Sequence, residues 1–119
     1  MTELTDREER TVELLSGAGL NKNIARIVVF LSKAGEAISS EIERTTDLRQ
    51  PEVSLAMKEL KGWGWIKERE LKKKGKGRPL KSYKLTHVLK DRVKELVDKR
   101  RKELKRIEEN LKELEKLVG

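Results

Sequence analysis

The chain has 119 residues and a formal net charge of +8, which predicts one small domain with a polyanionic partner. Charged residues make up 42% of the chain and hydrophobic residues 35%, so a small domain with a long solvated helix is favoured over a compact sandwich. The absence of cysteine excludes disulfides and thiolate metal sites, a single histidine argues against zinc, and no apolar run is long enough to span a membrane.

Two helices are predicted in the first third of the chain. Thr5 and Glu8 form a capping box that opens the first helix, and Gly17 ends it. Asn21 is positioned to cap the second helix. Helical spacing places one apolar face on that helix, made by Ile24, Ile27, Val28 and Leu31.

Residues 37–63 have the pattern of a helix-turn-helix. Ala37-Ile38 is predicted as a short strand, and Ser40 with Glu43 is predicted as the capping box of a helix of about two turns. Residues 45–49 form the turn, and Pro51 suits the first turn of the next helix, where its missing N–H costs nothing. The predicted core face of that helix consists of Val53, Ala56, Met57 and Leu60.

A basic β-hairpin is predicted next. Its strands are Trp65–Leu71 and Ser82–Thr86, and the Gly- and Pro-containing segment between them is a turn. Eight cations and no acid lie here and at the exit of the hairpin: Lys72, Lys73, Lys74, Lys76, Arg78, Lys81, Lys84 and Lys90. They equal the whole net charge, because the other 21 basic residues balance 21 acidic ones. The basicity is therefore focused on one hairpin.

The remainder of the chain is predicted to be one helix. From His87 to Val118 there is no Gly or Pro, so the helix would be ~48 Å long. Its apolar residues have heptad spacing, and the candidate dimerisation residues are Val97, Leu104, Ile107, Leu111, Leu114 and Val118. These residues form one stripe along the helix, which we call the seam, and Arg100 occupies a seam position between Val97 and Leu104. Parallel and antiparallel pairing with a second copy are both open. The expected division is a domain of residues 1–86, with its core at 21–86, and a coiled-coil helix of residues 87–119.

The face of the helix at residues 50–63 opposite its core is the candidate base-reading surface. It carries Gln50, Ser54, Leu55, Lys58 and Lys61, and Arg49 directly precedes it. A glutamine can make a bidentate contact to adenine, a serine can contact several bases, and a leucine can touch a thymine methyl group. The basic wing of residues 72–81 would contact the backbone through Lys72, Lys73, Lys74, Lys76, Arg78 and Lys81. Arg78 is the candidate for the minor groove, where the potential is most negative.

Two motifs resemble winged-helix transcription regulators of the ArsR and MarR type. Residues 47–54, DLRQPEVS, followed by Leu60 and Gly64-Trp65-Ile66, are similar to the recognition-helix region of those families. Residues 77–86, GRPLKSYKLT, look like their second wing strand. The long helix also resembles the arm of small archaeal winged-helix chromatin proteins. The metal-sensing members use cysteine or histidine clusters, which are absent here and argue against a metal-responsive repressor.

The resemblance implies an α-α-β-α-α-β-β-α order and dimeric binding to a palindromic operator. It implies DNA-reading roles for four residues and a wing role for a fifth, namely Gln50, Ser54, Leu55, Lys58 and Arg78. The expected fold class is mainly α with a small β-hairpin wing (α+β), a winged helix-turn-helix followed by a long C-terminal dimerisation helix.

The expected function is a homodimeric, sequence-specific, double-stranded-DNA-binding transcription regulator. We expect it to be cytoplasmic and nucleoid-associated, to be no enzyme, and to have no catalytic residues, cofactor, metal or membrane partner; the sequence names no effector. Two alternatives remain open. The protein could coat or bridge DNA with little specificity as an architectural chromatin protein, or it could be a protein-interaction module that uses Leu55 and Trp63.

Overall fold

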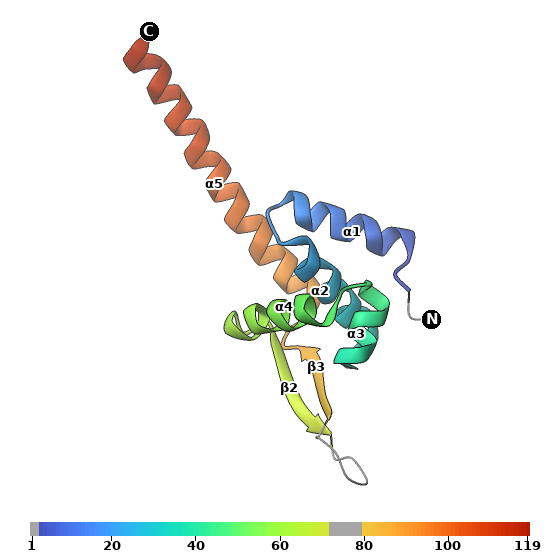
Figure 1. The fold of residues 1–119 in the computed structure, drawn as a ribbon. Coiled ribbons are helices and arrows are strands. Elements are labelled where there is room, and N and C mark those ends of the chain that lie inside the picture. Colours follow the sequence, from blue (N-terminus) through green and yellow to red (C-terminus); the bar gives the residue numbers. More distant parts are fainter. Residues whose placement is uncertain (1–2, 72–79) are drawn as a thin grey trace. The chain divides into compact units, whose positions relative to one another are not determined.

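The computed structural model describes residues 3–71 and 80–119. It divides into two units, Met1–Leu89 and Lys90–Gly119. Figure 1 shows the elements, which in chain order are α1 (Asp6–Gly17), α2 (Lys22–Ala34), β1 (Ala37–Ile38), α3 (Ser39–Thr46), α4 (Gln50–Gly62), β2 (Ile66–Leu71), β3 (Leu80–Leu85) and α5 (Leu89–Val118). The fold is a winged helix-turn-helix with a long C-terminal helix, which confirms the predicted class.

The first two helices begin as the sequence predicts. The Thr5 hydroxyl accepts from the Glu8 N–H at 3.2 Å, and the Glu8 carboxylate accepts from the Thr5 N–H at 2.7 Å. The Asn21 side chain accepts from the N–H groups of Asn23 and Ile24 and so caps α2. Each cap satisfies donors that a helix leaves unpaired at its start.

Helix α2 supplies the centre of the core. The predicted apolar face of α2 is buried. The helix has seven buried residues in all: Ile24, Ala25, Ile27, Val28, Val29, Phe30 and Leu31. Helices α1, α3 and α4 and strand β3 all contact α2. Two ion pairs tie α1 to it, Lys33–Glu8 at 3.0 Å and Arg26–Glu9 at 2.7 Å. Burial of this face therefore positions α1, α3, α4 and β3 around α2.

The start of α3 differs from the prediction. The helix begins at Ser39, and the Glu41 carboxylate accepts from the Ile38 N–H at 3.0 Å, so the box of Ser40 and Glu43 does not open it. The reason is tertiary, because Ile38 is held extended by its pairing with Ser82 of β3, and the helix starts as soon as that pairing ends. Ile42 is fully buried, as expected for the anchor of this helix.

Helix α4 follows the predicted pattern. Its predicted core face is buried and consists of Val53, Ala56, Met57 and Leu60. Gly64 lies two residues after the end of α4 and has a φ of +75°, a left-handed conformation that favours glycine. Trp63 and Trp65 flank this glycine, with ring centroids 5.4 Å apart in an edge-on arrangement. Trp65 is half-buried, whereas Trp63 is exposed.

The three strands form an antiparallel sheet in the order β1-β3-β2. Ala37 pairs with Tyr83 of β3, and Tyr83 also pairs with Glu68 of β2. The short strand predicted at Ala37-Ile38 therefore forms, and it pairs with the hairpin. In Figure 1 the hairpin of β2 and β3 extends away from α3 and α4.

Helix α5 runs for 30 residues without a buried side chain. At ~1.5 Å per residue it is ~45 Å long, close to the predicted length. No helix within residues 3–71 and 80–119 is both long and apolar enough to cross a membrane.

Leu60 and Leu55 of α4 offer a matched test of the core. Leu60→Ala should lower the free energy of unfolding by about 2–5 kcal/mol, because Leu60 is fully buried and its removal leaves a cavity. Leu55→Ala should change it by less than about 0.5 kcal/mol, because Leu55 is 63% exposed. Urea denaturation of both variants measures the difference, and equal losses would contradict the assignment of the core face.

Candidate nucleic-acid interface

An open groove of about 310 Å³ lies between α4, the start of α3 and the strands of the wing. We call it the α4–wing groove. Its lining residues are Ser39 and Glu43 from α3, Gln50, Val53, Ser54, Met57, Lys58 and Lys61 from α4, and Glu68, Lys81 and Tyr83 from the strands. Most of the residues predicted to read DNA are thus brought together with part of the wing.

The groove-lining polar residues of α4 form one stripe. Gln50, Ser54 and Lys58 follow one another at intervals of four residues, and all three are exposed. Residues spaced in this way lie on one side of a helix. The buried residues on the opposite side of α4 lock the rotation of the helix, so the stripe faces outward. Amide, hydroxyl and ammonium groups are therefore presented to the solvent in a row.

Arg49 and Leu55 lie apart from this stripe. Both are exposed, but neither lines the α4–wing groove. The Arg49 N–H donates to the Glu52 carboxylate at 3.1 Å, which fixes the entry into α4. Glu52 also accepts from the Asn23 side chain at 3.3 Å and so links α4 to α2.

Lys61 is engaged with the wing. Its Nζ lies 2.6 Å from Oε1 of Glu68 on β2. The hydrogen bond raises the pKa of Lys61 and lowers the pKa of Glu68, because each charge favours the ionised form of the other. The pair joins the end of α4 to β2. The negative charge of Glu68 also neutralises the positive charge of Lys61, which is one of the cations predicted to contact DNA.

The acidic members of the groove were not found by reasoning from the sequence. Glu43 and Glu68 line it, and so does Tyr83. Glu68 and Tyr83 are cross-strand partners, and Lys81 lies two residues from Tyr83 and therefore on the same face of β3. The strand register would have revealed Glu68 and Tyr83, but the glycine-containing connection leaves that register undetermined in the sequence. Glu43 reaches the groove through the packing of α3, which the sequence does not give.

The predicted wing cations fall mostly outside the described residues. Lys81 lies on β3, is exposed and lines the groove. The others, Lys72, Lys73, Lys74, Lys76 and Arg78, belong to residues 72–79, which are not among those described.

A polar cluster anchors the hairpin to the segment before β1. Arg69 of β2 donates to the two carboxylate oxygens of Glu36, from Nε at 2.5 Å and from Nη2 at 3.1 Å. The buried Ser82 of β3 donates its hydroxyl to the same carboxylate. Arg69 and then Ser82 lower the pKa of Glu36 to about 2. Glu36 therefore links both strands of the hairpin to the chain ahead of β1.

Residues 3–71 and 80–119 contain no group of three or more His, Cys, Asp or Glu side chains that could hold a metal ion.

Comparison with known proteins gives structural similarity alone. No protein-family model matches the chain, and no curated protein matches it in sequence. The solved structure of NadR in complex with 4-hydroxyphenylacetate is similar with a TM-score of 0.55 and 19% identity, covering 92% of this chain and 76% of that one. NMB1585, a MarR family regulator from Neisseria meningitidis, has a TM-score of 0.53 and 20% identity, with coverages of 92% and 84%. The transcriptional regulator PA4135 has a TM-score of 0.55 and 20% identity, with coverages of 94% and 87%. The chain therefore has the winged-helix fold found in MarR-type regulators.

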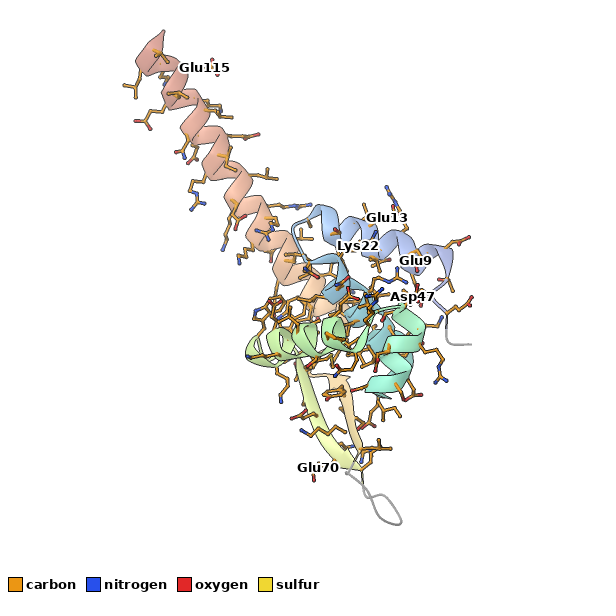
Figure 2. All side chains as sticks on the ribbon, in the orientation of Figure 1. Glu9, Glu13, Lys22, Asp47, Glu70 and Glu115 are labelled. Atoms are coloured by element: carbon orange, nitrogen blue, oxygen red, sulfur yellow. The ribbon has the colours of Figure 1, made fainter. Side chains whose placement is uncertain are left out.

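The contacts of Glu36 with Arg69 and Ser82, which we call the Glu36 cluster, predict that stability depends on pH. Because the pKa of Glu36 in the folded protein lies below its ordinary value of 4.5, its stabilising contribution is complete above about pH 4.5 and is lost as the pH falls toward 2. Glu36→Gln should lower the melting temperature at pH 6, and the difference from the unsubstituted protein should shrink toward pH 2. Thermal unfolding followed by circular dichroism measures this, with Glu70→Gln on the exposed end of β2 as control (Figure 2). A difference that stays constant from pH 6 to pH 2 would refute the assignment.

Proposed function

We propose that the protein is a double-stranded-DNA-binding transcription regulator that reads specific sequences as a homodimer. The recognition element is α4 in the major groove, and the basic wing contacts the backbone and the minor groove. The observation that carries this proposal is the outward stripe of Gln50, Ser54 and Lys58 in the α4–wing groove, on a fold found in known transcription regulators. A cytoplasmic protein without catalytic activity fits this role.

The chemistry of the stripe suits base recognition. Gln50 can pair with adenine through two hydrogen bonds, and Ser54 can donate to or accept from a base edge. Lys58 can contact guanine or a phosphate. Leu55, 63% exposed beside the stripe, can touch a thymine methyl group. Because α4 is locked by its buried face, these groups are presented without reorganisation of the helix.

The wing supplies the electrostatic part of the proposal. Lys81 borders the groove, and the sequence adds five cations at residues 72–78. Backbone contacts hold a protein on the duplex without reading its sequence. If about six cations contact phosphates, the slope of log affinity against log salt is about −5. Lys61 contributes less to this attraction, because Glu68 compensates its charge.

The dimer is proposed to form through the second unit. The seam of α5 from Leu104 to Val118 keeps its apolar side chains exposed. A row of this kind on a solvated helix is typical of a coiled coil that has a partner. The homodimer would then contain two copies of the winged-helix unit.

The base-reading role predicts a loss of specificity in a double variant. Gln50→Ala with Ser54→Ala should weaken binding to the preferred sequence about tenfold or more, because a good bidentate base contact contributes about 1–3 kcal/mol of discrimination. Binding to random DNA should change little. Electrophoretic mobility shifts on both probes test this, with the exposed Ser32→Ala on α2 as control. Equal losses on the two probes would count against base reading.

The wing role predicts a change in salt dependence. Joint replacement of Lys72, Lys73, Lys74 and Lys76 by Ala should weaken binding to all duplexes. It should also reduce the slope by about one unit for each lost phosphate contact. Fluorescence anisotropy across a salt series measures the slope, and a control variant replaces two lysines outside the wing, Lys112 and Lys116 on α5. An unchanged slope would remove the wing from the interface.

The whole proposal is tested by selecting fragmented genomic DNA on the purified protein at about 0.15 M salt and sequencing what is retained. A few enriched sites that share a motif establish a specific regulator. Uniform recovery would instead establish the low-specificity architectural role. No recovery would favour the protein-interaction module, in which the exposed Leu55 and Trp63 face a protein partner.

A further inference from the structure

The second unit carries an apolar seam that its own chain leaves uncovered. Leu104, Ile107, Leu111, Leu114 and Val118 are spaced alternately by three and four residues, and their exposed fractions lie between 50% and 77%. In heptad letters abcdefg, Leu104, Leu111 and Val118 are a positions, and Ile107 and Leu114 are d positions. The occupant that fits a heptad seam is a second seam of the same kind, so the partner considered is a second copy of this chain. This step rests on the homodimer of the proposed function.

A parallel, in-register pair meets an obstacle at Arg100. This residue occupies the d position one heptad before Ile107. Because parallel pairing places identical positions in one layer, the two copies of Arg100 would face each other inside the seam. Two like charges drawn out of water in one layer repel each other and lose hydration. The Arg100 guanidinium of each copy pairs with Glu103 of its own helix at 2.8 Å, so this acid does not bridge the two arginines across the seam.

The flanking charges also oppose parallel pairing. In a parallel coiled coil, a g residue meets the e residue five positions later on the partner. Glu103 is at g and Glu108 is at e, so each copy would set one glutamate against another. This contact occurs on both sides of the pair.

Antiparallel pairing removes both problems in one register. With Leu104 opposite Leu114 of the second copy, Ile107 lies opposite Leu111, and each of these layers is apolar and occurs twice. Arg100 then lies beside Val118 at the end of the seam, where a long side chain can cover an apolar neighbour and keep its charge in water. No layer contains two arginines.

The same register improves the flanking contacts. Arg101 and Glu115 are both e positions, and antiparallel pairing brings them together twice, once toward each end of the seam. Figure 2 shows Glu115 projecting from α5 near its C-terminal end. One Glu108–Glu108 contact remains at the centre. Antiparallel pairing therefore gives two attractive Arg101–Glu115 pairs and one repulsive Glu108 pair. Parallel pairing gives two repulsive Glu103–Glu108 pairs and a layer with two copies of Arg100.

The charge distribution along α5 points the same way. Residues 99–106, KRRKELKR, hold six cations and one acid, whereas residues 107–118 hold two cations and four acids. Antiparallel pairing in this register sets residues 99–106 of one helix against residues 112–119 of the other, which hold two cations and two acids. Parallel pairing sets residues 99–106 of the two copies together.

We infer that α5 pairs antiparallel with the α5 of a second copy, with Leu104 of each chain packed against Leu114 of the other. The start of α5 is then at opposite ends of the rod in the two chains. At ~1.5 Å per residue, the two Leu89 residues lie about 60 Å apart along its axis.

Cysteine cross-linking tests the orientation, because the chain has no cysteine of its own. Leu104→Cys and Leu114→Cys are prepared separately in the full-length protein and oxidised alone and after mixing. The antiparallel register predicts a disulfide-linked dimer only in the mixture. In each single variant the two cysteines lie about 15 Å apart along the rod, far beyond the Cβ separation of about 4 Å that a disulfide requires. Lys105→Cys mixed with Glu113→Cys lies at the same level but off the seam and should remain unlinked.

Each alternative outcome overturns the inference in a distinct way. Linking within a single variant establishes parallel pairing. A dimer by sedimentation that links in no mixture removes this seam from the interface. A monomer by sedimentation removes both the orientation and the homodimer, while DNA binding by the winged-helix unit is judged by the separate DNA selection.

A charge exchange gives an independent readout without cysteine. Arg101→Glu alone and Glu115→Arg alone should each weaken the dimer about tenfold, because two attractive pairs become repulsive. The double variant should restore the affinity, since the pairs are re-formed with reversed charges. Additive losses in the double variant contradict the antiparallel register, and the circular dichroism of each variant shows whether α5 remains helical.

Discussion

The buried face of α2 is the constraint on which the winged-helix unit depends. Ile24, Ile27 and Leu31 are almost completely inaccessible, and α1, α3, α4 and β3 all pack against this helix. The apolar face of α4 is buried toward the core, where α4 contacts α2, α3 and β2. The polar stripe of α4 is consequently directed outward, and the geometry of the candidate interface follows from the packing of residues that touch no ligand.

Two polar contacts then determine how the hairpin is held. Lys61 with Glu68 joins β2 to the end of α4, and Glu36 with Arg69 joins it to the segment before β1. Both contacts involve exposed groups, so neither is a large source of stability by itself. Their joint effect is geometric, because they connect β2 to two different parts of the unit. The acids Glu36 and Glu68 also lower the positive potential near the strands.

Local patterns account for what the sequence predicts well. Thr5 and Asn21 act as caps because a cap involves residues close in the chain, and Val53 to Leu60 form a core face because helical spacing is a local property. The start of α3 was misplaced because strand pairing with a residue far along the chain extends Ile38. The sequence did not predict three residues that line the groove, namely Glu43, Glu68 and Tyr83. They come together through tertiary packing and strand register, which are not local properties of the chain. The predicted roles of the individual site residues in DNA and dimer contacts stay predictions.

The pairing of β1 with β3 has a kinetic consequence. The helices α1 to α4 contact neighbours that are close in sequence, whereas Glu36 and Ser82 are 46 residues apart. Closing so long a loop costs chain entropy before its contacts form, so we expect the helical core to assemble first and the sheet to close last. Contacts made after the transition state govern the rate of unfolding rather than the rate of folding. The Glu36 cluster thus acts mainly on the lifetime of the folded wing and has little influence on how fast the chain reaches its native state.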